Sequence, residues 1–368
     1  MHKKIKILFF HPHSNIGGAD LSIANLINSL SSKYYDFHFI CLKKSKIKEY
    51  LKKKIKIHII KKSKVLLSIF DIRKIIKNNS NLDQKVLFIS NQYFANIISS
   101  ISLTGIKNIK KIFLERNHLD ELKNYENIMD FFKKKIIQFS LKFFYKRAEI
   151  IICNSSKAAY DLKRKISLNV KYIYNPTYDK NKFLKYKKNF NKSNKYIINV
   201  ARFEKQKDHL TLLKSFKKIY TQTNYNLVLI GYGSEEHSIR KYIKKYCLQK
   251  KIRIIKTSKN TMKYIKNAEL FILTSLYEGL PNVLIESIAL HTPVISADCN
   301  SGPREILLNG KGGYLFKKKD HNSLARKIMT YYKNPSNLKK KTSFAHTKLF
   351  RFDRRIISKK FHQIFMSL

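Results

Sequence analysis

The sequence predicts an α/β protein made of two doubly wound domains. Short apolar runs alternate with helical stretches along almost the whole chain, which is typical of parallel strands covered by helices on both faces. A length of 368 residues suggests two domains, at roughly 100–200 residues each. The polar segment 178–195 interrupts the rhythm near the middle and is expected to link the two domains.

The expected strands form two sets, one on each side of this linker. Each run is rich in Ile, Leu, Val and Phe and is too short to be a helix. The first set comprises Ile5–Phe10, Phe37–Leu42, Ile55–Ile60, Val86–Ile89, Ile112–Leu114 and Ile150–Cys153. The second set comprises Tyr196–Val200, Leu227–Ile230, Ile252–Ile255, Leu270–Leu273, Val294–Ser296 and Tyr314–Phe316. The two domains are therefore expected to span residues 1–177 and 196–349.

In three segments the spacing of apolar and charged residues predicts how the element is exposed or packed. In 55–60, isoleucines alternate with Lys56 and His58, which predicts a strand with one buried and one wet face. The stretch Ile128–Arg147 reads as a basic amphipathic helix, suited either to a membrane interface or, as the favoured interpretation, to the core. Residues 350–368 space their apolar side chains as a helix does, and are expected to pack back on the first domain.

The charge is strongly positive, with 76 Lys and Arg against 24 Asp and Glu and a net charge of +52. Lysine dominates and is spread over nearly every segment, which indicates compositional drift, attraction to an anionic membrane face or, third, nucleic-acid binding. No nucleic-acid motif is present. The four cysteines lie far apart, which excludes a disulfide framework and a Cys-based zinc site. With no apolar run long enough for a signal peptide or a membrane span, we expect a cytoplasmic protein.

Two motifs at the ends of strands could approach a phosphate. Gly17 and Gly18 come between the first strand and a helix, where backbone N–H groups can reach a phosphate or a sugar. Arg202 and Lys207 follow the first strand of the second domain and could clamp a diphosphate. Taken alone, each motif also fits an ordinary role: a tight turn, or two cations that are neighbours by chance in a lysine-rich chain.

The segment 275–289 is the most informative. It turns at Gly279 and Pro281 into a helix, with Glu278 in the turn and Glu286 about one turn into the helix. Two carboxylates at a strand-to-helix crossover stand out in a chain with 24 acidic residues. They can accept hydrogen bonds from sugar hydroxyls while the helix N-terminus faces a phosphate. The structural alternative is a helix cap beside a surface glutamate.

With these motifs in register, the chain resembles the retaining glycosyltransferases of family 4, which have the GT-B fold. The glycine loop, the diphosphate-binding cation pair and the Glu-x7-Glu signature of that family all have counterparts here. These are Gly17-Gly18, Arg202 with Lys207, and Glu278 with Glu286. Further matches are Asn154-Ser155, Tyr174-Asn175-Pro176 and Gly302-Pro303-Arg304-Glu305. The resemblance implies two Rossmann-like, doubly wound domains that face each other across a cleft.

The resemblance also implies roles for individual residues. The first domain would bind the acceptor and the second the nucleotide sugar. The implied catalytic residues are Glu278, His118, Arg202 and Lys207. The implied donor-binding residues are Gly17, Gly18, Arg202, Lys207, Gly279, Leu280, Pro281, Asn282 and Glu286. The two cations would neutralise the diphosphate, Glu278 would hold sugar hydroxyls, Glu286 the ribose, and His118 would help to position donor and acceptor. No metal and no cofactor beyond the nucleotide-sugar donor is implied.

Two short motifs narrow the resemblance. Glu115-Arg116-Asn117-His118 and Ser301-Gly302-Pro303-Arg304-Glu305 resemble bacterial enzymes that extend polyprenyl-diphosphate-linked glycans. They imply transfer of a hexose or N-acetylhexosamine from a UDP-sugar to a membrane-linked glycan, in surface polysaccharide, lipopolysaccharide or glycoprotein-glycan assembly. The protein would then lie at the inner face of the cell membrane. The alternative is a non-enzymatic protein that binds polyanions or membranes through its charge on a GT-B scaffold.

Overall fold

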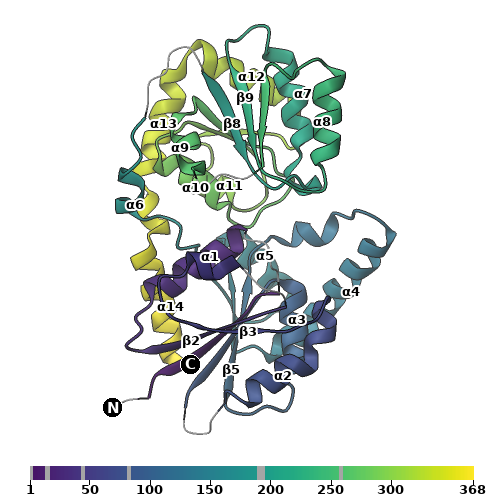
Figure 1. The fold of residues 1–368 in the computed structure, drawn as a ribbon, viewed down its shortest axis with the longest axis vertical. Helices are drawn as coiled ribbons and strands as arrows, with labels where there is room; N and C mark the ends of the chain where they lie inside the picture. Colours follow the sequence, from purple (N-terminus) through teal and green to yellow (C-terminus); the bar gives the residue numbers. More distant parts are fainter. Residues whose placement is uncertain (1–2, 13–16, 43–45, 81–83, 189–194, 257–259) are drawn as a thin grey trace. The chain divides into compact units, whose positions relative to one another are not determined.

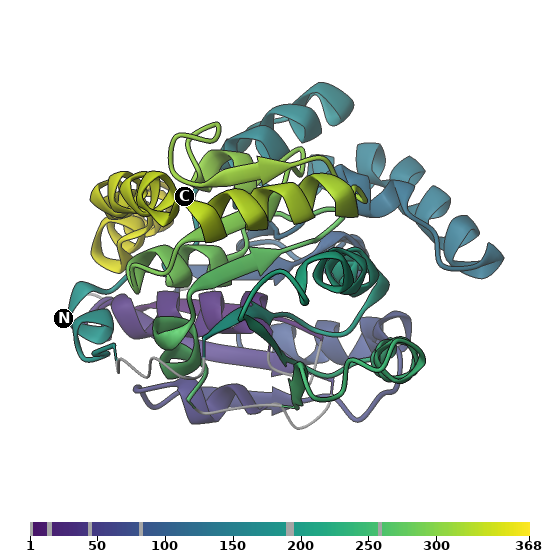
Figure 2. The ribbon, with the colours of Figure 1, turned by 90° about the horizontal axis from the view of Figure 1, so that it is seen from above.

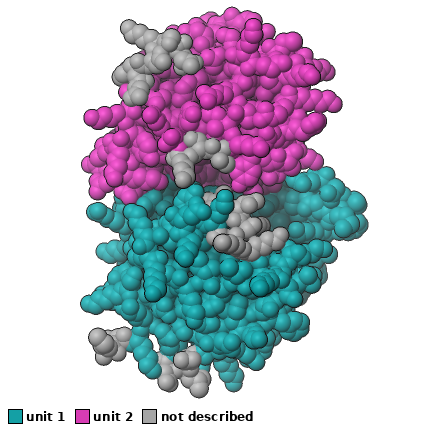
Figure 3. Space-filling model, viewed as in Figure 1, with its two compact units in different colours: residues 1–177, 352–368 teal, residues 178–351 magenta. Residues whose placement is uncertain are grey.

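The computed structural model describes residues 3–12, 17–42, 46–80, 84–188, 195–256 and 260–368 (Figure 1). The chain divides into two compact units, coloured in Figure 3. Unit 1 comprises residues 1–177 together with 352–368, and unit 2 comprises residues 178–351. Each unit holds a parallel sheet, so the predicted fold class of two Rossmann-like α/β domains is confirmed.

The sheet of unit 1 has the order β3-β2-β1-β4-β5-β6-β7. Its strands are β1 (Ile5–Phe10), β2 (Tyr35–Cys41), β3 (Lys56–Ile59), β4 (Val86–Asn91), β5 (Ile109–Glu115), β6 (Ile150–Cys153) and β7 (Val170–Tyr172). Its α-helices are α1 (Gly18–Ser29), α2 (Ile69–Lys77), α3 (Tyr93–Ser102), α4 (Ile128–Phe144), α5 (Ser156–Ile166) and α14 (Arg354–Ser367). The order places the first strand next to the fourth, as in doubly wound sheets.

Alternate residues of β1 enter different cores, because successive side chains of a strand point to opposite faces. Ile7 and Phe9 join a core that α1 and α14 cover, and Leu8 and Phe10 join a second core beneath α2 and α3. Both faces of the strand are thus buried, which explains its nearly continuous apolar sequence, interrupted by Lys6. The segment expected to pack back on the first domain does so within unit 1, since α14 contacts α1 there and buries Ile357, Phe361 and Phe365.

The sheet of unit 2 has the order β10-β9-β8-β11-β12-β13. Its strands are β8 (Tyr196–Val200), β9 (Asn226–Ile230), β10 (Ile252–Ile255), β11 (Leu270–Leu273), β12 (Val294–Ala297) and β13 (Tyr314–Phe316). Its α-helices are α6 (Lys180–Leu184), α7 (His209–Ile219), α8 (Glu236–Lys245), α9 (Thr261–Asn267), α10 (Asn282–Ala289), α11 (Pro303–Ile306), α12 (His321–Lys333) and α13 (Pro335–Thr347). Figure 1 shows α7 and α8 on one side of β8 and β9, and α9 and α10 on the other.

Three local expectations differ from the structure. The strand β7 was not predicted; it has three residues at the edge of the sheet, and its Lys171 and Tyr172 are exposed. The alternation predicted for 55–60 is wrong, because Ile59 is 50% exposed on the edge strand β3, which has one neighbour. Part of the expected linker folds as the short helix α6, with Phe183 buried, while residues 189–194 lie outside the described chain.

Helix α4 has one buried and one exposed apolar face, and the buried face confirms the favoured interpretation of Ile128–Arg147 as a helix that packs in the core. Ile137 and Leu141 are buried in unit 1. A second set of large apolar side chains on the same helix is exposed. Figures 1 and 2 show α4 at the periphery of unit 1. Among the helices that the structure describes, none is both long and apolar enough to cross a membrane.

Candidate functional site

The candidate site begins at the centre of the unit 2 sheet, where the strand order reverses. β8 and β11 are neighbours there, and the helix that follows each strand covers a different face. In open α/β sheets, ligands bind in the crevice at such a point, beyond the carboxyl ends of the strands. Lys207 follows β8 and Glu278 follows β11, so this edge of the sheet holds two of the predicted site residues.

The side chains of Lys207 and Glu278 form an ion pair. Nζ of Lys207 lies 2.5 Å from Oε1 of Glu278, and the two side chains are 15% and 7% exposed. The hydroxyl of Ser275 donates to the same carboxylate oxygen at 2.6 Å. Because both charges are largely withdrawn from water, this contact is stronger than a surface ion pair. The sequence placed both residues at one sheet edge but did not predict that they touch.

Backbone hydrogen bonds fix the position of Lys207 beside Glu278. The hydroxyl of Thr274 donates to the carbonyl of Lys207 at 2.7 Å. The N–H of Leu276 donates to the carbonyl of Gln206 at 2.8 Å, and the Gln206 amide donates to the carbonyl of Tyr277 at 2.8 Å. The loops that follow β8 and β11 are therefore joined at several points, and the ion pair does not depend on side-chain torsions alone.

The turn from Glu278 into α10 is in close contact with residues 301 and 302. Ser301 donates from its hydroxyl to the carbonyl of Glu278 at 2.6 Å. Gly302 has φ +78°, and a Cβ at this position would lie 2.3 Å from the carbonyl oxygen of Gly279 and 2.8 Å from Cδ of Pro281. A side chain at residue 302 would therefore displace the turn. Glycine is required here both by its φ and by the close approach of the backbone.

The remaining predicted residues of unit 2 lie at the same sheet edge. Arg202 is exposed just after β8, and Glu286 is half-buried in α10. The side chain of Leu280 is buried, so at that position the backbone is the part that can face a ligand. Pro281 has no N–H, which leaves Gly279, Leu280 and Asn282 as the backbone donors of this turn. Across the described residues, no group of His, Cys, Asp and Glu could hold a metal ion.

The loop that carries Arg202 is held by close backbone contacts with β9. The N–H of Phe203 donates to the carbonyl of Tyr232 at 2.8 Å. A Cβ at Gly231 would lie 1.9 Å from the carbonyl oxygen of Ala201, so a larger residue at 231 would displace this loop. The glycines after β9 thus support the placement of Arg202.

The predicted residues of unit 1 lie at the carboxyl edge of its own sheet. Gly17 and Gly18 begin α1, where the N–H of Gly17 donates to Asp20 at 2.9 Å. His118 follows β5, and its Nε2 lies 2.8 Å from Asp161 while its Nδ1 accepts from the N–H of Asp120 at 3.1 Å. Burial lowers the pKa of His118, but its hydrogen bonds to both aspartates outweigh burial and raise the pKa overall. Both ring nitrogens thus have protein partners.

A buried polar chain at the switch point of unit 1 joins two motif residues, Arg116 and Asn175, to residues that the sequence analysis did not name. Nε2 of His11, after β1, lies 3.0 Å from Asp20, and its Nδ1 lies 2.9 Å from the amide of Asn91 at the end of β4. Arg116 then donates to Asn91 at 3.0 Å and to Asn175 at 2.7 Å. Burial lowers the pKa of Arg116 to about 10. The usable signal was position, because His11 directly follows an apolar run and Asn91 lies two residues beyond the end of another.

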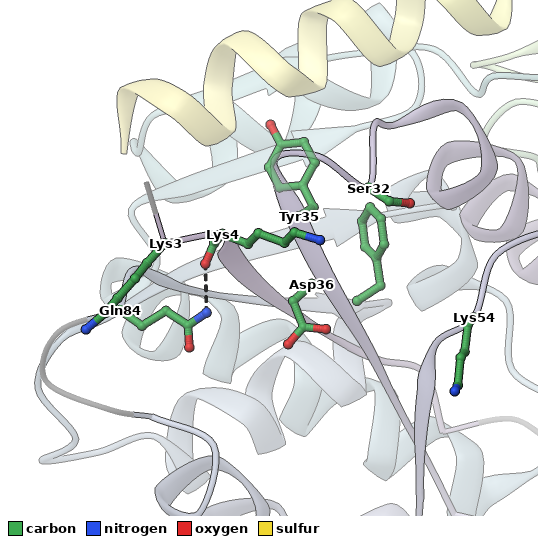
Figure 4. Close-up of a pocket in the computed structure, with 8 residues that line it drawn as sticks. Lys3, Lys4, Ser32, Tyr35, Asp36, Lys54 and Gln84 are labelled. Carbon is green, nitrogen blue, oxygen red and sulfur yellow. Dashed lines mark hydrogen bonds between the residues drawn. The ribbon is translucent and has the colours of Figure 1, made fainter. Parts of the chain in front are cut away.

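A hollow of about 510 Å³ lies elsewhere in unit 1 (Figure 4). It is lined by residues that precede or begin strands, among them Lys4, Tyr35 and Gln84, and the Gln84 amide donates to the carbonyl of Lys4 at 2.7 Å. These are the amino ends of β1, β2 and β4. Ligands of doubly wound sheets bind at the opposite, carboxyl ends, so this hollow is not the candidate site.

Buried His209 supports the strands β8 and β11, from which the unit 2 site is built, and makes the stability of the fold depend on pH. Its Nε2 lies 3.1 Å from Oδ1 of Asn199, whose amide donates to the carbonyl of Ile272 and so ties β8 to β11. Burial, followed by the charge of Lys207, lowers the pKa of His209 to about 4. The folded protein therefore keeps this ring neutral as the pH falls below about 6.5, while the unfolded chain takes up a proton.

We expect His209→Gln to flatten the loss of stability in acid. Gln keeps a donor for Asn199 but does not titrate, so the free energy of unfolding should fall by roughly 2 kcal/mol less between pH 7 and pH 5 than it does in the wild type. Urea unfolding at both pH values measures this difference. His237→Gln, at an exposed position on α8, is the control and should follow the wild-type profile. An equal loss in His209→Gln and the wild type would contradict the assignment.

Comparison with known proteins shows that unit 2 is similar to one family. The family described as "Glycosyl transferases group 1" matches residues 180–347, which is almost all of this unit. Residues 180–347 are thus similar to a group 1 glycosyltransferase domain. The match includes Arg202, Lys207, Glu278 and Glu286.

Three curated relatives resemble parts of the chain. An uncharacterized glycosyltransferase of Methanocaldococcus jannaschii is 36% identical over 184 residues, which is 47% of this chain and 45% of that protein. A Campylobacter jejuni N-acetylgalactosamine-N,N'-diacetylbacillosaminyl-diphospho-undecaprenol 4-alpha-N-acetylgalactosaminyltransferase is 28% identical over 61% of each chain. The amylovoran biosynthesis glycosyltransferase AmsD of Erwinia amylovora is 26% identical over 80% of this chain and 81% of its own. The chain thus spans about half to three fifths of the first two relatives.

Solved structures extend the likeness in fold to both units. The crystal structure of Anabaena HepE in complex with UDP and glucose has a TM-score of 0.81, covers 99% of this chain and 100% of its own, and is 17% identical in sequence. An identity this low shows a common fold. The GT-B class expected from the sequence is consistent with this neighbour and with the two parallel sheets.

Proposed function

We propose that the chain is a glycosyltransferase that moves a hexose or N-acetylhexosamine from a UDP-sugar to a polyprenyl-diphosphate-linked glycan, with retention at the anomeric carbon. The observation that carries the proposal is the Lys207–Glu278 pair at the switch point of a domain that matches the group 1 glycosyltransferase family. The name of the Campylobacter jejuni relative, which specifies a diphospho-undecaprenol-linked acceptor, supports this acceptor class. The UDP and glucose bound to Anabaena HepE support the donor class.

The ion pair suggests how the site receives its donor. A diphosphate carries more negative charge than one carboxylate, so a donor in the crevice would draw the ammonium of Lys207 away from Glu278. The Glu278 carboxylate, still held by Ser275, would then be available to accept hydrogen bonds from sugar hydroxyls. Exposed Arg202 would add a second cation on the diphosphate, and Glu286 would accept from the ribose hydroxyls.

In the transfer step, the acceptor hydroxyl oxygen forms a bond to the anomeric carbon on the face from which the diphosphate leaves. The bond between that carbon and the diphosphate oxygen breaks, and the departing phosphate takes the acceptor proton. Lys207, Arg202 and the N–H groups of the Gly279–Asn282 turn stabilise the charge that develops on the phosphate. Gly17 and Gly18 would approach the same diphosphate, and His118 would position the acceptor from its contacts with Asp120 and Asp161.

Thermal stabilisation by nucleotides tests the donor site. We expect UDP to raise the melting temperature more than GDP or ADP at physiological salt, because a base-specific site separates the three and a charged surface does not. At 100 times the dissociation constant, binding to the folded state contributes about 2.7 kcal/mol. Glu286→Ala should remove most of this response, since it removes the ribose acceptor.

Glu269→Ala is the matched control. This carboxylate lies at the amino end of β11, paired with Lys188, and its loss should leave the response to UDP intact. An equal response to all three nucleotides that fades with added salt would refute the donor site. It would instead favour the alternative of a polyanion binder that uses the net charge of +52.

A further inference from the structure

The outer face of α4 carries a continuous apolar stripe. At about 100° per residue, its large exposed side chains fall within about 100° of arc around the helix. They are Ile128, Met129, Phe132, Ile136, Phe139 and Phe143. Phe132 is 58% and Phe139 75% exposed, and the rings of Phe139 and Phe143 pack against each other at 5.4 Å between centroids. The opposite side of the helix packs in unit 1 through Ile137 and Leu141, so the stripe is not needed to hold the helix.

Basic side chains border this stripe. Lys135 and Lys142 lie along one edge and Lys133 along the other, and all three are exposed. Between residues 128 and 147 the sequence has six basic residues and one acidic residue, Asp130, whose carboxylate is paired with Lys134 at 2.7 Å. The border is therefore uniformly positive. A helix with an apolar face and flanking lysines fits the boundary between the acyl chains and the anionic headgroups of a bilayer.

We infer that the exposed face of α4 docks on an anionic membrane surface, with its phenylalanine and isoleucine side chains at the level of the acyl boundary. A second copy of this chain is a poor occupant, because each copy carries a net charge of +52 and the two would repel. An acidic bilayer matches both features, because its acyl chains can contact the apolar stripe and its anionic headgroups can contact the lysines at the border. The inference goes beyond the proposed function, since vesicle binding requires neither donor nor acceptor.

Sedimentation with vesicles tests the inference. The full chain should bind vesicles of phosphatidylglycerol and phosphatidylethanolamine and should not bind phosphatidylcholine vesicles. Replacing Phe132, Phe139 and Phe143 by Ser should lower the affinity on the order of tenfold per ring. Lys135→Gln with Lys142→Gln should lower it by about fivefold per lysine and reduce its salt dependence. The replaced side chains are exposed, so the melting temperature should not change.

Matched controls come from unit 2. Leu210→Ser with Phe344→Ser removes exposed apolar side chains there, and Lys339→Gln with Lys340→Gln removes exposed charge; neither pair should change vesicle binding appreciably. Undiminished binding after loss of the three phenylalanines would overturn the inference and assign attraction to the dispersed lysines. A dimer that dissociates with the same substitutions would also overturn it, in favour of a second copy. A normal response to UDP in the phenylalanine variant separates this inference from the proposed function.

The chain contains no tryptophan, which allows a direct test of insertion. Phe139→Trp places a single fluorophore on the stripe, and its emission should shift to shorter wavelength when phosphatidylglycerol vesicles are added. Phe344→Trp in unit 2 should show no such shift. Vesicle binding without a shift at position 139 would overturn the inference, because the stripe would then remain in water.

Discussion

Glu278→Gln and Lys207→Ala should each lower kcat/KM for glycosyl transfer by about 10²–10³-fold. In the proposed mechanism each side chain contributes charge or a hydrogen bond where the diphosphate leaves, and the loss of one such group has effects of this size. The two residues form one ion pair, so their effects should not multiply. The double variant should lose little more than the poorer single variant. Initial rates with a UDP-sugar and an undecaprenyl-diphosphate-linked acceptor measure all three.

The controls for this result share the chemistry but not the position. Lys205→Ala removes an exposed lysine from the same short turn, Lys205–Lys207, and should keep most of the activity. Glu269→Gln alters a carboxylate at the amino end of β11 and should do the same. Urea unfolding of each variant separates loss of chemistry from loss of fold. Near-wild-type transfer by folded Glu278→Gln or Lys207→Ala would refute the site assignment.

Gly302→Ala should destabilise unit 2 by about 2–4 kcal/mol and weaken the binding of UDP. The substitution has two costs. An alanine at φ +78° is strained by about 1–3 kcal/mol, and its Cβ would lie 2.3 Å from the carbonyl oxygen of Gly279. To relieve that contact, the turn between Glu278 and α10 must move, and the backbone N–H groups proposed to bind the diphosphate move with it. Urea unfolding and titration with UDP measure the two effects.

Gly310→Ala is the control that separates the effect of a positive φ from the effect of a Cβ in contact with neighbouring backbone. Gly310 also has a positive φ, +88°, but the nearest atoms to a Cβ there are 4.0 Å away. This variant should lose only the conformational contribution, about 1 kcal/mol, and should bind UDP normally. If both alanine variants lost the same stability and kept the same affinity for UDP, the turn would not depend on the space that Gly302 provides.

The sequence was most informative where burial covers both faces of a strand. β1 and β4 are largely apolar because each sends alternate side chains into two cores, and such runs are visible without a structure. β7 was missed for the opposite reason: of its three residues only Val170 is buried, and the others are an exposed lysine and tyrosine. On the edge strand β3 the predicted alternation of burial failed, because the single neighbouring strand β2 leaves Ile59 exposed.

The site was predicted residue by residue but not as a set of contacts. Lys207 could be placed after β8 from the sequence, but its contact with Glu278 depends on the hydrogen bonds that join two loops about 70 residues apart. The chain His11–Asn91–Arg116 in unit 1 was missed because polar side chains become buried only through partners from other strands. Local patterns do not contain that information.

Helix α14 has a consequence for the synthesis of the protein. It supplies Ile357, Phe361 and Phe365 to the first core of unit 1, although all of unit 2 separates it from that unit along the chain. On the ribosome, the strands around β1 emerge early but wait for their last covering helix until unit 2 has been translated. At about 5–20 residues per second, that delay is on the order of ten seconds. During it the nascent chain exposes apolar surface, which makes unit 1 a substrate for chaperones that act during translation.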